Sequence, residues 1–292
     1  MDQAARLRRL ALSPQKPQPL EKTKIKSRII TVTSGKGGVG KTNLVVNLSL
    51  ALAQFGKRVA ILDADLGLAN LDVMLGVVPR YTLYDVVRGR KNLAEIAIKG
   101  PAGVILLPGG SGLTELADLS EEKRRALIND LQLLEDMADI ILIDTGAGLS
   151  RTVLSFVAAA DEMLMITTPE PTAICDAYGV IKVTARQQLQ QKINLIVNQV
   201  KNAREGKETA ERLMRACEKF LQMELQFLGE ICSDQRVAMA VKQQQPFITL
   251  YPHSAAAENV RRIAGTLLAV PVEKKRGLPG FLYRLVQLWE KG

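Results

Sequence analysis

The most constraining feature of the chain is a glycine-rich turn between a short apolar run and an amphipathic segment. Residues 35–42 read Gly-Lys-Gly-Gly-Val-Gly-Lys-Thr and match the pattern GxxxxGK[ST]. The apolar run Ile29–Thr33 predicts a strand before the turn, and Asn43–Phe55 predicts a helix after it. Glycines let backbone N–H groups curl around phosphate oxygens at a helix N-terminus. The sequence therefore predicts a phosphate-binding loop between a strand and a helix.

The types of residue in this loop indicate that the phosphates belong to a nucleotide. Lys41 is placed to reach the β- and γ-phosphates, and the Thr42 hydroxyl is placed to ligate Mg²⁺. The residues expected to contact the nucleotide are Gly35, Gly37, Gly38, Val39, Gly40, Lys41 and Thr42.

The rest of the chain between residues 29 and 270 alternates apolar runs with helical stretches. Expected strands are Ile29–Thr33, Val59–Asp63, Val104–Leu107, Ile140–Asp144, Met163–Thr167, Ile193–Val197 and Phe227–Ile231. Expected helices lie near 42–55, 120–137, 171–189, 204–222, 234–242 and 254–268. Most of the strands are continuously apolar, which is typical of a sheet covered on both faces. The pattern predicts one α/β domain with a doubly wound, mostly parallel sheet of the P-loop NTPase type.

The net charge of +9 is concentrated at the two ends of the chain. Residues 1–30 contain eight basic and two acidic groups, and residues 271–292 contain five basic and two acidic groups. The body between them is neutral, with 26 groups of each sign. We interpret residues 1–28, with their prolines, as a mobile arm and linker, and residues 271–292 as a basic hinge and a terminal helix.

Lys36–Thr42 resembles the deviant phosphate loop of the MinD/ParA ATPases, which has a second, earlier lysine. The resemblance covers about residues 29–270 and implies a Mg²⁺-dependent ATPase with a MinD-like fold. It also implies that two copies form a nucleotide-sandwich homodimer on ATP, in which Lys36 contacts the ATP of the partner subunit. A second cation beside the phosphates offsets transition-state charge.

Aspartates follow two of the expected strands, at the sheet edge where open α/β sheets bind ligands. Asp63 and Asp65 follow one strand, and Asp144 ends the apolar run Ile140–Ile143 in a Walker-B pattern. The resemblance implies that Asp63 and Asp144 organise Mg²⁺ and that Asp65 positions the attacking water. Backbone N–H groups of the following loop, Gly148 included, would sense the γ-phosphate. The family often has proline where Gly146 stands.

Later strand ends supply Asn198 and Asp234. In the family such positions frame adenine, and the Asn198 amide has a donor and an acceptor for a purine edge. Structural capping is an equally simple role for both residues. ATP rather than GTP is implied by the resemblance, and Asn198–Lys201 lacks a convincing NKxD guanine motif.

The last segment predicts an amphipathic helix. Its apolar face contains Phe281, Leu282, Leu285, Leu288 and Trp289. A helix of roughly 20 Å is too short to cross a bilayer, but it can lie in the interface of an anionic membrane. The alternative is a helix docked on the core, and the two are compatible if the helix docks in one nucleotide state and is released in another.

The first residues, Asp2–Arg8, contain the string DQAxxLR. It resembles the N-terminal activator segment of the FlhG/FleN (YlxH) branch of the family, regulators of flagellar placement and number. The resemblance implies that Gln3 stimulates an FlhF-type GTPase of the signal-recognition type, and that flagellar switch components are further partners. A glutamine in a GTPase site orients an attacking water.

Other function classes fit less well. A DNA-partition ATPase of ParA type is the alternative, but the neutral body disfavours DNA binding. An iron–sulfur carrier needs clustered cysteines, and the chain has three scattered ones with no CxxC. The chain has no hydrophobic signal segment and no apolar run long enough to span a bilayer. We therefore expect a cytoplasmic protein that binds reversibly to the inner face of the cell membrane.

Overall fold

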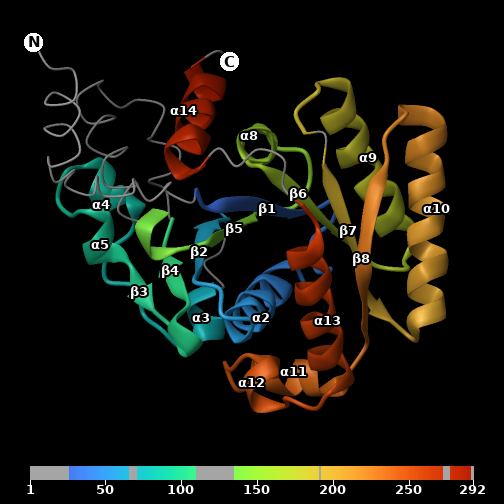
Figure 1. Cartoon of the computed structure of the whole chain (residues 1–292), viewed down its shortest axis with the longest axis horizontal. Helices are drawn as coiled ribbons and strands as arrows, with labels where there is room; N and C mark the ends of the chain where they lie inside the picture. The colour runs from blue at the N-terminus through green and yellow to red at the C-terminus, as the bar shows by residue number, and fades with distance from the viewer. Residues whose placement is uncertain (1–25, 66–70, 110–134, 191, 272–276, 291–292) are drawn as a thin grey trace, which may run out of the picture.

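The computed structural model describes residues 26–65, 71–109, 135–190, 192–271 and 277–290. In this part of the chain an eight-stranded sheet lies at the centre, in the order β3-β4-β2-β5-β1-β6-β7-β8 (Figure 1). The strands are β1 (Arg28–Ser34), β2 (Val59–Ala64), β3 (Ile98–Lys99), β4 (Ile105–Leu107), β5 (Ile140–Thr145), β6 (Glu162–Thr167), β7 (Ile193–Val200) and β8 (Leu225–Cys232). Pairing is parallel except between β3 and β4. The predicted doubly wound, mostly parallel sheet is confirmed.

Helices cover both faces of the sheet (Figure 1). Side chains of β1 alternate between the faces: Ile30 and Val32 pack in the cluster of α2 and α13, whereas Ile29 packs in the cluster of α8 and α14. The helices are α2 (Lys41–Gln54), α3 (Leu71–Leu75), α4 (Leu83–Val87), α5 (Leu93–Ile96), α8 (Arg151–Ala159), α9 (Pro171–Arg186), α10 (Ala203–Leu221), α11 (Gln235–Lys242), α12 (Phe247–Leu250), α13 (Ala255–Ala269) and α14 (Gly277–Glu290).

The seven expected strands are present. The elements that the sequence did not predict are the nine-residue helix α8, which follows the loop after β5, and several shorter ones. The edge strand β3 has two residues, and α3, α4, α5 and α12 have four or five each, so hydrophobic periodicity has too little length to reveal them. Local capping forms two of these helices, because Thr82 pairs with Asp85 and Asn92 pairs with Glu95 in capping boxes. The helix expected near 120–137 lies outside the described residues, apart from its last turn.

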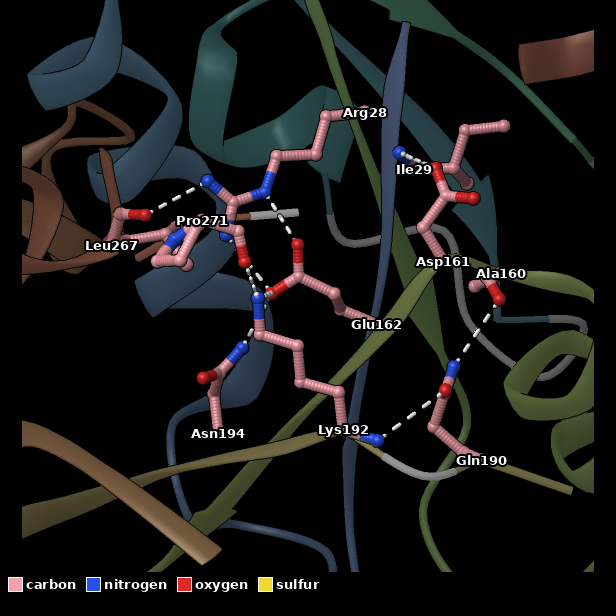
Figure 2. Close-up of polar contacts among 10 residues, drawn as sticks. All are labelled: Arg28, Ile29, Ala160, Asp161, Glu162, Gln190, Lys192, Asn194, Leu267 and Pro271. Carbon is pink, nitrogen blue, oxygen red and sulfur yellow. Dashed lines mark hydrogen bonds and ion pairs between the residues drawn. The ribbon is translucent and has the colours of Figure 1, made fainter. Parts of the chain in front are cut away.

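A buried ionic network joins distant parts of the chain at the amino ends of the strands (Figure 2). The Arg28 guanidinium donates to both carboxylate oxygens of Glu162, at 2.5 and 2.9 Å, and to the carbonyl of Leu267 at 2.8 Å. Lys192 lies 3.4 Å from Glu162 and donates to the carbonyl of Pro271 at 2.5 Å. The network therefore ties the start of β1 to the end of α13 and to Pro271, on the edge of the sheet opposite the phosphate loop.

Candidate functional site

The glycine-rich turn lies where predicted, between the end of β1 and the start of α2. A Cβ atom at Gly35 would lie 2.2 Å from the backbone of Asp176, so the close approach of α9 requires glycine there. Gly40 has a φ of +86° and precedes the first residue of α2, a left-handed conformation that glycine adopts without strain. The turn is thus shaped as a phosphate loop at a helix N-terminus.

Lys41 and Asp144 form a buried ion pair at the centre of the site. The Lys41 Nζ atom lies 2.6 Å from Asp144 Oδ1, and the two side chains are 8% and 1% exposed. Burial raises the pKa of Asp144, and the ammonium of Lys41 and the hydroxyl of Thr42 oppose that shift by stabilising the carboxylate. Three residues predicted to act on nucleotide and metal are therefore in direct contact.

Asp63 lies beside Asp144, because the two aspartates are register partners on β2 and β5. Burial raises the pKa of Asp63 to about 7. The Asp65 N–H donates to Asp63 Oδ1 at 3.2 Å and opposes this increase. The nearby charges of Asp144 and Asp65 raise the pKa further. A Cβ atom at Gly146 would lie 3.7 Å from Asp65 Oδ1, which puts Asp65 next to the loop that follows β5. The structure brings the three predicted acids together at one edge of the sheet.

The oxygen atoms at this edge fit a magnesium ion bound together with a nucleotide. The Thr42 hydroxyl contacts Asp144, and Asp63 flanks it, so the edge offers one hydroxyl and two carboxylates. Mg²⁺ prefers oxygen ligands and is usually held by one or two carboxylates plus substrate phosphates and water. A divalent cation would also remove the cost of ionising the buried Asp63.

Lys36, the earlier lysine of the loop, contacts the start of α9 in its own chain. Its Nζ atom donates to Glu170 Oε1 at 2.7 Å and to Thr172 Oγ1 at 3.2 Å. The ammonium lowers the pKa of Glu170. The side chain of Lys36 is 40% exposed, so solvent reaches this contact. Neither Glu170 nor Thr172 was predicted from the sequence, because the segment Thr168–Pro171 before α9 contains no motif that would have revealed them.

The loop after β5, residues 146–150, is linked to the phosphate loop through Gly148. The Gly148 N–H donates to the carbonyl of Ser34 at 2.8 Å, and Gly148 has a φ of +88°. The N–H predicted to sense a γ-phosphate is therefore engaged with the last residue of β1. The same loop ends at Ser150, which caps α8.

Asn198 and Asp234 line one cavity of about 240 Å³ beside the phosphate loop, together with Asn43 and Phe247. Asp234 caps α11 and accepts from the Arg236 N–H at 2.9 Å, so the capping role is the one observed. The Asn198 amide faces the phosphate loop. Its adjacent residue Gln199, which the sequence analysis missed, lines the same cavity.

The predicted amphipathic helix is docked as α14. Phe281, Leu282 and Leu285 are buried in the cluster formed with α8 and the sheet, and Leu288 and Trp289 are partly buried. Phe156 of α8 stacks on Phe281 and meets Trp289 edge to face, each at 6.1 Å between ring centroids. In this structure the apolar face is therefore covered by the domain itself. Among the described helices, none has the length and apolarity needed to cross a membrane.

Residues of α8 and of the segment before β5 hold the two ends of α14. Glu135 accepts from the Leu278 N–H at 2.8 Å, and Arg151 donates to the carbonyls of Leu288 and Trp289 at 3.4 and 3.0 Å. These contacts were not predictable from the sequence, because they join segments far apart in the chain. Gln3 lies outside the described residues, as do the hinge residues 272–276.

The chain is similar to known proteins both in sequence and in structure. A protein-family model described as the CobQ/CobB/MinD/ParA nucleotide binding domain matches residues 30–247. The chain is 40% identical to the antiactivator FleN of Pseudomonas aeruginosa, over 89% of this chain and 94% of that protein. It is 34% identical to the flagellum site-determining protein YlxH of Helicobacter pylori, over 98% of each. The septum site-determining protein MinD of Pyrococcus horikoshii, complexed with Mg-ADP, superposes with a TM-score of 0.66 at 29% identity, over 83% of this chain and 97% of that one.

Proposed function

Because the chain belongs to the CobQ/CobB/MinD/ParA family of nucleotide-binding domains, we propose that it is a MinD-like regulatory ATPase controlling the number or placement of flagella. The observation that carries the ATPase proposal is the Lys41–Asp144 pair at the end of a phosphate loop, with Asp63 and Asp65 beside it. Similarity to FleN and YlxH along most of the chain supports the flagellar role.

In this proposal the residues of the phosphate loop have one set of tasks and those of the acidic edge, Asp63, Asp65 and Asp144, have another. N–H groups of the loop bind the phosphates at the start of α2. When the nucleotide binds, the Lys41 ammonium leaves Asp144 and contacts a phosphate oxygen instead. Thr42, Asp144 and Asp63 would hold Mg²⁺, which supplies charge neutralisation when bound. Asp65, next to residues 146–150, positions the attacking water. Hydrolysis thus depends mainly on placement and charge.

We propose that ATP joins two copies of the chain through Lys36. The Lys36 ammonium is solvent-accessible and sits on the loop itself, so it can leave Glu170 and meet the nucleotide of a second copy. A cation contributed in this way stabilises the transition state only in the dimer. The contact with Glu170 is then the resting state of the monomer.

The membrane role is assigned to α14, after release from the domain. Undocking exposes Phe281, Leu282 and Leu285, each worth about 1.5–3 kcal/mol of burial, so release in water is unfavourable. Insertion into a lipid interface buries the same side chains again. Two helices from one dimer add avidity, so weak binding by each helix suits a reversible switch.

The segment 1–28 is assigned to stimulation of an FlhF-type GTPase, with Gln3 as the residue that enters the partner site. We expect Gln3→Ala to leave ATP hydrolysis by this chain unchanged and to abolish the stimulation. Undiminished GTP hydrolysis by the partner, in the presence of the variant, would rule out the role of Gln3.

The test of the proposed function is co-sedimentation of the full chain with anionic vesicles of phosphatidylglycerol and phosphatidylcholine. We expect Mg²⁺ and ATP to raise the bound fraction severalfold over ADP, and Lys41→Ala to remove the difference. A chain ending at Pro271, and Leu288→Gln in the full chain, should both lose binding while retaining ATP binding. Equal binding with ATP and ADP would contradict the ATP-dependent membrane switch, and equal binding by the shortened chain would remove α14 from it.

A further inference from the structure

The carboxyl end of β7 carries an irregularity that turns two consecutive side chains toward the phosphate loop. Pairing between β7 and β8 shifts register between Val197 and Val200, and Gln199 within that interval has a φ of +59°. A left-handed conformation is uncommon for a residue other than glycine, and bulges beside binding sites re-aim side chains. Asn198 and Gln199 are the residues re-aimed here.

Both side chains bond to carbonyl groups of the loop. Asn198 Nδ2 donates to the carbonyl of Val39 at 2.8 Å, and Gln199 Nε2 donates to the carbonyl of Gly38 at 3.3 Å. The Asn198 Oδ1 atom accepts from the Gln199 N–H at 2.9 Å, which fixes the orientation of the amide. A Cβ atom at Gly40 would lie 2.5 Å from Asn198 Nδ2, so the amide is in close contact with the loop.

The direction of a loop carbonyl determines the direction of the next N–H. In a trans peptide unit the C=O and the following N–H are coplanar and point in opposite directions. Holding the carbonyls of Gly38 and Val39 toward β7 therefore turns the N–H groups of Val39 and Gly40 toward the other side of the loop. Backbone N–H groups that converge in this way are what a phosphate loop offers to an anion.

We propose that Asn198 and Gln199 are positioning residues that hold the phosphate loop in its anion-binding conformation. The proposal rests on the proposed function, because it assumes that this loop binds the phosphates of ATP. The Asn198 amide uses one donor on Val39 and one acceptor on Gln199. The contribution that Asn198 makes through the loop extends to ligands that have no base.

Inorganic tripolyphosphate separates the two roles, because it has the phosphates of ATP and no purine. We would measure displacement of a fluorescent ATP analogue by ATP and by tripolyphosphate, with Mg²⁺. Asn198→Ala should weaken both competitors by the same factor, about tenfold, the equivalent of one lost hydrogen bond. Gln199→Ala should weaken both by about threefold, because its bond is longer and more exposed.

Ser233→Ala is the matched control, since Ser233 lines the same cavity just after β8 and the change is also neutral. It should leave the affinity for tripolyphosphate unchanged. The thermal midpoints of all variants without ligand should agree to within about 4 °C, the shift expected for one lost hydrogen bond. Weaker binding of ATP with unchanged binding of tripolyphosphate in Asn198→Ala would overturn the inference in favour of purine reading. Unchanged binding of both would overturn it as well. No binding of ATP by the unmodified chain would instead refute the proposed function.

Discussion

Burial strongly affects the ionisation of Asp63 in the candidate site. The pKa of its carboxyl is raised to about 7 from an ordinary value of 3.8, chiefly because the group is buried. The unfolded chain loses this proton near pH 4, whereas the folded chain retains it until about pH 7. Stability contributed by the bound proton is therefore present at low pH and is lost as the pH rises through 7.

We accordingly predict that Asp63→Asn stabilises the metal-free protein more at pH 8 than at pH 5. The amide removes the cost of ionising a buried group, so the gain in the free energy of unfolding should be larger at pH 8 by about 3 kcal/mol. Urea unfolding in EDTA at the two pH values measures the difference. An equal effect of the substitution at pH 5 and pH 8 would show that the folded carboxyl has an ordinary pKa.

A second prediction at the residue scale concerns Lys36 and Glu170. Lys36→Ala should prevent dimerisation with a non-hydrolysable ATP analogue, because the cation that reaches the partner subunit is gone. Glu170→Gln should retain dimerisation and slightly lower the dimer dissociation constant, since it frees Lys36 from a solvent-exposed ion pair. Light scattering across protein concentrations distinguishes the two variants. A dimer that persists in Lys36→Ala would exclude the lysine from the interface.

At the scale of elements, α14 and the site are connected through α8. Residues 146–150 contain Gly148, which bonds to Ser34, and they lead directly into α8. Arg151 in the first turn of α8 donates to the carbonyls of Leu288 and Trp289 near the end of α14. Arginine at a helix C-terminus and Glu135 at the N-terminus both complement the helix dipole. A shift of residues 146–150 toward a γ-phosphate would displace the arginine that holds α14.

We predict that Arg151→Met increases membrane binding without ATP. Loss of the contact costs about 1 kcal/mol, which raises the released fraction of α14 by about fivefold. Vesicle co-sedimentation and amide exchange across 277–290 measure the release. Arg212→Met, an equal change of charge on the exposed face of α10, is the control and should leave both unchanged. If both variants bind vesicles alike, charge rather than docking governs the interaction.

The sequence predicted the strands and the phosphate loop because each has a local signature. Ile140–Asp144 is an apolar run with an acid at its end, and Gly35–Thr42 fits one backbone shape. The contacts that decide how the site works lie between segments far apart in the chain: Lys36 with Glu170, Asn198 with Val39, Arg151 with Trp289. The sequence has no local feature that identifies such pairs. Amphipathicity likewise predicted the apolar face of α14 but not whether that face packs on the protein or on a membrane, because a core and a lipid surface select the same residues.

At the scale of the whole molecule, the buried network opposite the site joins segments that are otherwise far apart in sequence. Glu162 is fully buried and is bonded by Arg28 at the start of β1 and by Lys192 and Asn194 at the start of β7 (Figure 2). Through Arg28 and Lys192 it also fixes the end of α13 and Pro271, after which the chain continues to α14. A buried charge is tolerated only while it remains fully paired.

We therefore predict that Glu162→Gln lowers the free energy of unfolding by about 3 kcal/mol, because it leaves the buried Arg28 without a counter-charge. Arg28→Met in the same background should cost much less than it does alone, since the charge that needed Glu162 is then absent. Urea unfolding of the two single variants and the double variant gives the coupling between them. Glu208→Gln, which breaks the exposed pair with Arg204, is the control and should have no measurable effect. Strictly additive losses in the double variant would mean that the two side chains contribute independently and that the network does not act as a unit.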